Sequence, residues 1–65
     1  MKEALVFYRK KAGYKQMAVA AELGLDRSTV AKWETGKASP RPNTLYKLAK
    51  LYGCTMEELM EKVPA

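Results

Sequence analysis

The stretch that decides the fold spans residues 16–37 and reads QMAVAAELGLDRSTVAKWETGK. Its apolar residues keep helical spacing on both sides of a central Gly24-Leu25-Asp26 break, with Val19, Ala20 and Leu23 before it and Val30 and Trp33 after it. The glycine permits a left-handed or close-packed turn, Leu25 is expected to fill the angle between the helices, and Asp26 is a good N-cap. This layout predicts a helix-turn-helix at about residues 16–34, with helices over 16–23 and 27–34.

Similar signals extend the helical pattern toward both ends of the chain. A first helix is expected over residues 2–12, where a glycine follows as a stop. Pro42 suits the first turn of a fourth helix that Gly53 ends, and Thr55 with Glu58 forms a capping-box pair that opens a fifth. The side chains expected to face inward from these flanking helices are Leu5, Tyr8, Ala12, Leu45, Leu48, Ala49, Tyr52 and Leu59. No segment alternates like a strand, so we predict an all-α fold, a compact bundle of five short helices.

Length and composition limit the classes of function. A chain of 65 residues supports one small domain, residues 1–65, with a thin margin of stability. With one cysteine and no histidine, neither a tetrahedral zinc set nor a histidine-dependent catalytic pair can be built, so we expect no enzyme activity, metal or cofactor. No signal peptide or bilayer-spanning stretch is evident, and a single cysteine favours a reducing, cytoplasmic location without membrane contact. The net charge of +5 points to an anionic partner.

The second helix of the predicted helix-turn-helix would present a polar face. Arg27, Ser28 and Lys32 are expected to point outward, with Thr29 at the margin. Such a helix can lie in the DNA major groove with its N-terminal side chains on base edges. Arg27 could hold a guanine by a bidentate pair, worth about 1–3 kcal/mol of discrimination. The alternative interpretation is that these basic side chains only solvate an exposed helix face.

A longer pattern joins this stretch to the rest of the chain. Residues 16–37 are followed by Pro40, by Thr44-Leu45-x-x-Leu48-Ala49, by Gly53 and by Glu58-Leu59. With this spacing, the chain resembles the Xre/Cro/cI-type helix-turn-helix DNA-binding domains over about residues 3–60. The resemblance implies a lambda-repressor-like fold and sequence-specific binding to double-stranded DNA.

The resemblance also assigns roles to single residues. Its implied base-reading residues are Arg27, Ser28 and Lys32, and its implied phosphate- or backbone-contacting residues are Gln16, Thr35, Lys37 and Arg41. Gln16 is also implied to brace the recognition helix. The resemblance implies that Arg9 and Glu34 form an ion pair. We interpret this pair as structural, because losing one partner would leave a partly buried charge without its counter-ion.

Lys15 and Arg41 are among the positions that depart from the family pattern. Lys15 stands where Ser or Thr usually caps the second helix, and the helix dipole disfavours a cation there unless a phosphate is bound, so we interpret Lys15 as a further phosphate contact. Arg41 likewise replaces a small capping residue. Residues 9–50 hold ten basic and three acidic side chains, whereas residues 51–65 hold one basic and three acidic. The positive charge is therefore concentrated on the stretch expected to face DNA.

The chain is also expected to self-associate. One short recognition helix reads few base pairs, so we expect a homodimer on a palindromic operator with half-sites roughly 34 Å apart. Leu51, Met56 and Met60, extended by Val63, predict a dimerisation surface near the fourth and fifth helices. The alternatives are that these methionines only fill the core, or that an apolar N-terminal pair, Val6 and Phe7, forms the contact.

These features favour a transcriptional regulator, a repressor that excludes polymerase by occupying an operator as a dimer. An antitoxin, which binds both its promoter and a toxin protein, is an alternative within the same family. A helix-turn-helix scaffold for protein–protein contact is an alternative of a different class. The basic face at Arg27, Lys32 and Lys37 favours DNA over the scaffold, because a protein-binding scaffold needs no such face.

Overall fold

A computed structural model describes residues 1–61 of the protein. Its helices are α1 (Lys2–Lys11), α2 (Gln16–Leu23), α3 (Arg27–Thr35), α4 (Pro42–Tyr52) and α5 (Met56–Met60). Within this part of the chain no residue adopts strand structure. The predicted all-α fold is therefore confirmed, and the helix boundaries agree with the predicted ones within one residue. Val63, which the predicted dimerisation surface included, lies outside the described residues.

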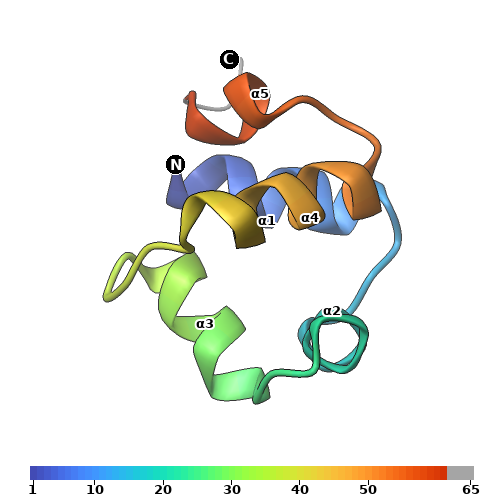
Figure 1. The fold of residues 1–65 in the computed structure, drawn as a ribbon, viewed down its shortest axis with the longest axis vertical. Helices are drawn as coiled ribbons and strands as arrows, with labels where there is room; N and C mark the ends of the chain where they lie inside the picture. The colour runs from blue at the N-terminus through green and yellow to red at the C-terminus, as the bar shows by residue number, and fades with distance from the viewer. Residues whose placement is uncertain (62–65) are drawn as a thin grey trace.

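The helices are arranged around a central pair. Figure 1 shows α1 and α4 lying across the middle of the molecule, with α5 above them and with α2 and α3 at the opposite end. Helix α1 contacts α3, α4 and α5, and α2 packs mainly on α3. This arrangement places the acidic α5 at the end of the molecule opposite the helix-turn-helix.

The core lies where all five helices meet. Its buried apolar residues are Ala4, Leu5, Val19, Ala20, Val30, Trp33, Leu45, Leu48, Ala49, Tyr52 and Leu59. Every helix contributes at least one of them, so no helix is attached to the outside of a preformed core. Burial of each large aliphatic side chain stabilises the fold by about 1.5–3 kcal/mol. Because the core is this small, helix-terminus contacts and ion pairs carry a large share of the stability.

Two predicted inward positions are wrong. Ala12 is exposed because α1 ends at Lys11, and the buried positions of this helix are Ala4, Leu5 and the charged Arg9. Leu25 does not fill the angle between α2 and α3, since its side chain is 41% exposed. Backbone hydrogen bonds close that turn instead, so the turn needs no apolar plug.

The turn between α2 and α3 is built from backbone chemistry. Gly24 adopts a left-handed conformation with φ of 67°, which side-chain-bearing residues adopt at a cost. Its N–H donates to the carbonyl of Ala21 at 3.2 Å, and the N–H of Leu25 donates to the carbonyl of Ala20 at 2.9 Å. These bonds satisfy carbonyls that the helix end would otherwise leave unpaired. These bonds, within residues 20–25, shape the turn that separates α2 from the N-cap Asp26 of α3.

Candidate nucleic-acid interface

The N-terminus of α3 is held by its capping residue. Asp26 accepts a hydrogen bond from the backbone N–H of Ser28 at 3.0 Å and a second, short one from the Ser28 hydroxyl. These two bonds, the hydroxyl's above all, hold the pKa of the Asp26 carboxyl below its usual 3.8. Asp26 is therefore ionised at neutral pH. In this structure the Ser28 hydroxyl proton is committed to Asp26, so the oxygen is left to accept.

The outer face of α3 is polar and accessible. Arg27, Ser28 and Lys32 are exposed and Thr29 is half-buried, while the opposite face buries Val30 and Trp33 against the core. Ser28 and Lys32 lie one helical turn apart and Arg27 directly precedes Ser28, so the three share one side of the helix. All four predicted base-reading side chains thus lie on the first turn and a half of α3, away from the core.

Gln16 connects the start of α2 to both ends of α3. Its Nε2 donates to Glu34 Oε1 at 3.0 Å, and its Oε1 accepts a hydrogen bond from Arg27 Nη1 at 3.4 Å. One amide group therefore bonds both the last turn of α3, through Glu34, and the first residue of that helix, through Arg27. The structure gives Gln16 a bracing role within the protein, with its first-turn position on α2 leaving it beside the exposed face of α3.

A bidentate ion pair lies behind this amide. Arg9 donates from Nε to Glu34 Oε2 at 2.6 Å and from Nη2 to Glu34 Oε1 at 3.0 Å. Its Nη1 donates to the carbonyl of Tyr14 at 2.8 Å. The side chains of Arg9 and Glu34 are only 10% and 5% exposed. Arg9 therefore fastens α1 to both α3 and the segment before α2, in the fork geometry that makes such pairs strong.

The predicted phosphate contacts lie on two separate segments. Lys15 is the N-cap of α2 and Arg41 the N-cap of α4, and neither side chain bonds the helix that it precedes. Thr35 and Lys37 flank the left-handed Gly36, which ends α3, and the Thr35 hydroxyl donates to the carbonyl of Lys32 at 3.3 Å. All four side chains are exposed. Figure 1 shows the loop between α3 and α4 projecting from one side of the molecule.

Sequence reasoning missed one basic residue beside this loop. The side chain of Lys2 lies against Gly36, with Cδ 3.1 Å and Nζ 3.7 Å from the point that a Cβ would occupy there. A cation from the first turn of α1 is thereby placed next to Lys37. The two positions are far apart in the chain, so no local pattern could have indicated this neighbourhood.

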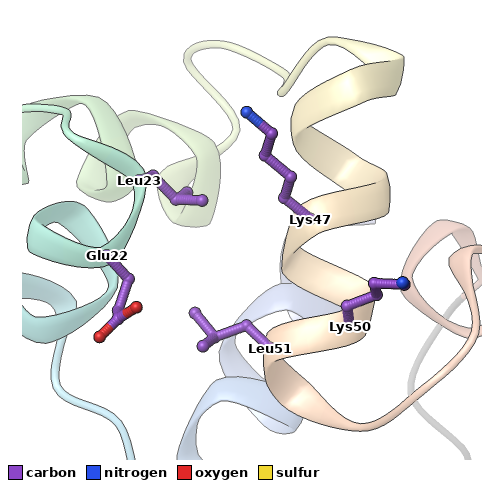
Figure 2. Close-up of a pocket in the computed structure, with 5 residues that line it drawn as sticks. All are labelled: Glu22, Leu23, Lys47, Lys50 and Leu51. Carbon is purple, nitrogen blue, oxygen red and sulfur yellow. The ribbon is translucent and has the colours of Figure 1, made fainter.

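The predicted dimerisation residues do not point the same way. Leu51 is half-buried, and Figure 2 shows its side chain directed toward α2 and away from α5. Met56 is half-buried and packs against the core, whereas Met60 is 56% exposed. On the alternative N-terminal surface, Phe7 is 40% exposed and meets the Tyr8 ring edge to face. The apolar surface is thus divided among several sites.

Other kinds of site are not seen in the part of the chain that the structure describes. Residues 1–61 contain no group of three or more cysteine and acidic side chains placed to hold a metal ion. None of their helices combines the length and the apolar character that crossing a membrane requires.

Comparison of the sequence with known proteins assigns the chain to a family. A family model described as "Helix-turn-helix" matches residues 7–59. An HTH-type transcriptional regulator of Methanocaldococcus jannaschii is 34% identical over 59 residues, covering 91% of this chain and 89% of its own. A prophage-derived HTH-type transcriptional regulator of Bacillus subtilis is 37% identical over 59 residues, of which this chain spans 55% of the length.

A third relative and the solved structures complete the comparison. An HTH-type transcriptional regulator of Archaeoglobus fulgidus is 33% identical over 52 residues, covering 80% of this chain and 74% of its own. No solved structure matches significantly. The family match spans most of the chain and includes both helices of the turn, the exposed face of α3 and the Arg9–Glu34 pair. The chain therefore belongs to the Xre/Cro/cI-type helix-turn-helix family.

Proposed function

We propose that this protein binds double-stranded DNA in a sequence-specific manner and represses transcription by occupying an operator. The observation that carries the proposal is the exposed polar face of α3, a helix that Gln16 and Arg9 hold in place through their hydrogen bonds to Glu34. A recognition helix held this way enters a groove with little further ordering, which lowers the entropic cost of binding. The names of the relatives, all HTH-type transcriptional regulators, support the same function.

Arg27, Ser28, Thr29 and Lys32 would read base edges in the major groove. Among them, Arg27 has the donor geometry for the O6 and N7 atoms of guanine. Because its contact with Gln16 is long, at 3.4 Å and exposed to solvent, little energy is lost when the guanidinium turns toward a base. Ser28, with its proton donated to Asp26, would accept a hydrogen bond from a base or a bridging water.

Lys15, Gln16, Thr35, Lys37 and Arg41 would hold the sugar-phosphate backbone. They lie at the start of α2, at the end of α3 and along the segment from α3 to α4. If about five phosphates are neutralised per subunit, the logarithm of affinity should fall against the logarithm of salt concentration with a slope of roughly −4 to −5. The three glutamates at the α5 end lie away from this surface and would not oppose it.

Selectivity would come from two copies on one operator. A single helix of this length contacts a few base pairs, whereas a two-fold pair reads two half-sites about one turn of DNA apart. A dimer bound beside a promoter would exclude polymerase from it. No effector need enter this mechanism, since abundance alone sets occupancy.

The test is selection of bound sequences from a random pool of DNA duplexes. We expect an enriched palindrome whose half-sites lie about one helical turn apart. A variant with Arg27→Ala should select a relaxed base at one position, while Lys50→Ala, which removes the same charge from the outer face of α4, should select the original site. Failure to enrich any sequence at low salt would overturn the proposal in favour of a protein-binding scaffold.

A further inference from the structure

A groove separates the last turn of α2 from the outer face of α4. It has a volume of about 360 Å³ and is lined by Glu22, Leu23, Lys47, Lys50 and Leu51. Figure 2 shows Leu23 and Leu51 extending toward each other from the two helices, with Lys47 and Lys50 on the α4 side and Glu22 on the α2 side. Both leucines are only half-buried. The groove therefore has an apolar floor, the Lys47 ammonium group along the α4 wall and the Glu22 carboxylate on the other. The Lys50 ammonium group points away from Leu51 and lies over the Tyr46 ring, 5.1 Å from its centroid.

This groove lies apart from the proposed DNA interface. Leu23 is the last residue of α2, whereas Gln16 is its first, and a helix of eight residues is about 12 Å long. The two lysines lie on the second and third turns of α4, beyond the N-cap position of Arg41. No residue of α3 lines the groove.

The outer face of α5 has the complementary chemistry. Glu57, Met60 and Glu61 are all exposed and follow i, i+3, i+4 spacing, so they lie together on the side away from the buried Leu59. The intervening Glu58 is occupied elsewhere, since it accepts hydrogen bonds from Thr55 and Tyr8. Met60, which is 56% exposed, thus lies beside two carboxylates that form no side-chain ion pair within residues 1–61.

We propose that α5 of one copy docks in the α2–α4 groove of a second copy. Met60 would lie between Leu23 and Leu51, and one of the carboxylates of Glu57 and Glu61 would meet the ammonium group of Lys47. The other would meet Lys50, whose exposed side chain would turn from the Tyr46 ring toward the groove. The spacings match, because side chains three or four residues apart on a helix are about 5–6 Å from each other. Glu22 on the opposite wall repels an acidic helix from that side, so it directs the two glutamates toward the lysines.

The contact would be asymmetric. Leu51 points toward α2 and away from α5, so the groove and the outer face of α5 belong to different sides of α4. In the proposed arrangement one contact between two copies leaves a free groove on one and a free α5 on the other, which is a head-to-tail arrangement. Copies on neighbouring DNA sites could fill them cooperatively through this contact. It is distinct from the two-fold pairing proposed on one operator and requires no DNA.

The test uses the whole protein without DNA. Its backbone amide chemical shifts are measured by NMR in a dilution series. A small, charged contact is expected to be weak, and shift perturbation detects weak association that sedimentation misses. We expect concentration-dependent shifts at Leu23, Lys47 and Leu51 and at Met60. A wild-type protein without such shifts, or with shifts only elsewhere, would overturn the proposal.

Charge exchange tests the pairing itself. A groove variant with Lys47→Glu and Lys50→Glu, and an α5 variant with Glu57→Lys and Glu61→Lys, should each lose the concentration-dependent shifts. Mixing labelled groove variant with unlabelled α5 variant should restore the shifts at Leu23 and Leu51, because the exchanged charges again attract. Circular dichroism checks that both variants fold, as expected for exposed positions.

Three further outcomes would contradict the proposal that α5 of a second copy occupies the α2–α4 groove. If either variant keeps the shifts, or if the mixture does not restore them, the proposed pairing is wrong. If the wild-type protein shows no self-association but its groove amides shift on adding a synthetic acidic helical peptide, the occupant is another acidic protein. Because DNA is absent throughout, each of these failures leaves the proposed DNA-binding function standing.

Discussion

Replacing Arg9 by methionine should remove a large part of the stability of this domain. The change leaves the Glu34 carboxylate, whose side chain is 5% exposed, without its cation. Removing one partner of a buried pair typically costs about 3–5 kcal/mol, because the other charge stays desolvated and uncompensated. Gln16 still donates one hydrogen bond to Glu34, which places the expected loss toward the lower end of that range. A domain of this size has only about 3–10 kcal/mol in total.

Urea unfolding measures this loss. Trp33 is 6% exposed in the folded protein, so its fluorescence reports the transition, and linear extrapolation gives the free energy of unfolding. The double variant Arg9→Met, Glu34→Met is the control, since it removes both charges and keeps apolar volume. We expect the double variant to be more stable than Arg9→Met alone, because a buried pair replaced by apolar side chains is often neutral in stability.

Two results would refute this reasoning. Exposed ion pairs contribute less than about 1 kcal/mol to the free energy of unfolding. A loss that small for Arg9→Met would mean that water reaches the Glu34 carboxylate freely. The single variant Glu34→Met completes the comparison. A double variant whose loss of unfolding free energy equals the sum of the losses in Arg9→Met and Glu34→Met would mean that the two residues act independently. The fork geometry at 2.6 and 3.0 Å predicts strong coupling instead.

Three further changes test the turn, a helix cap and the interface. Gly24→Ala should cost about 1–2 kcal/mol in urea unfolding, because its φ of 67° is strained for alanine although nothing lies within 4 Å of the added Cβ. The hydrogen bond from the backbone N–H of Thr55 holds the pKa of Glu58 below its usual 4.5, so its contribution to stability is complete above that pH and is lost as the pH falls through the lower folded value. Glu58→Gln, which keeps the capping box but does not titrate, should therefore flatten the acid limb of the melting temperature plotted against pH. Arg27→Ala should reduce discrimination at one base pair by about 1–3 kcal/mol, whereas Lys37→Ala should weaken all duplexes alike and lower the salt slope, as fluorescence anisotropy would measure.

Each of these expectations has a result that contradicts it. A Gly24→Ala variant as stable as the wild type would mean that the turn relaxes to another conformation. An unchanged acid limb in Glu58→Gln would place the acid-sensitive group elsewhere, with Asp26, whose pKa is also lowered, as the next candidate. Equal losses on specific and random duplexes for Arg27→Ala would assign that side chain to a phosphate and not to a base.

Helix boundaries could be predicted because local chemistry sets them. Asp26 caps α3 and the Thr55–Glu58 capping box opens α5, each through hydrogen bonds within three residues. Pro42 suits the first turn of α4 because its φ is fixed near the helical value. The left-handed Gly24 ends α2 in the same way. Such signals act within one turn of chain, so the sequence alone contains them. The exposed face of α3 follows from the same periodicity.

Contacts between distant segments decided the rest. Ala12 and Leu25 fit an apolar pattern but are exposed, because burial depends on where the neighbouring helices lie. Lys2 lies beside Gly36 only because α1 crosses the end of α3. The groove at Leu23 and Leu51 is lined by residues of α2 and α4, which only the packing of the chain brings together.

The sequence by itself determined that this chain is all-helical, where its helices begin and end, and which side chains α3 presents. Capping, glycine conformation and apolar spacing are short-range and act before any packing. Tertiary structure alone decided that Gln16 bonds both Arg27 and Glu34, and how far Arg9 and Glu34 are removed from water. Those facts depend on the angle between packed helices, which is set by how the side chains of the whole core fit together.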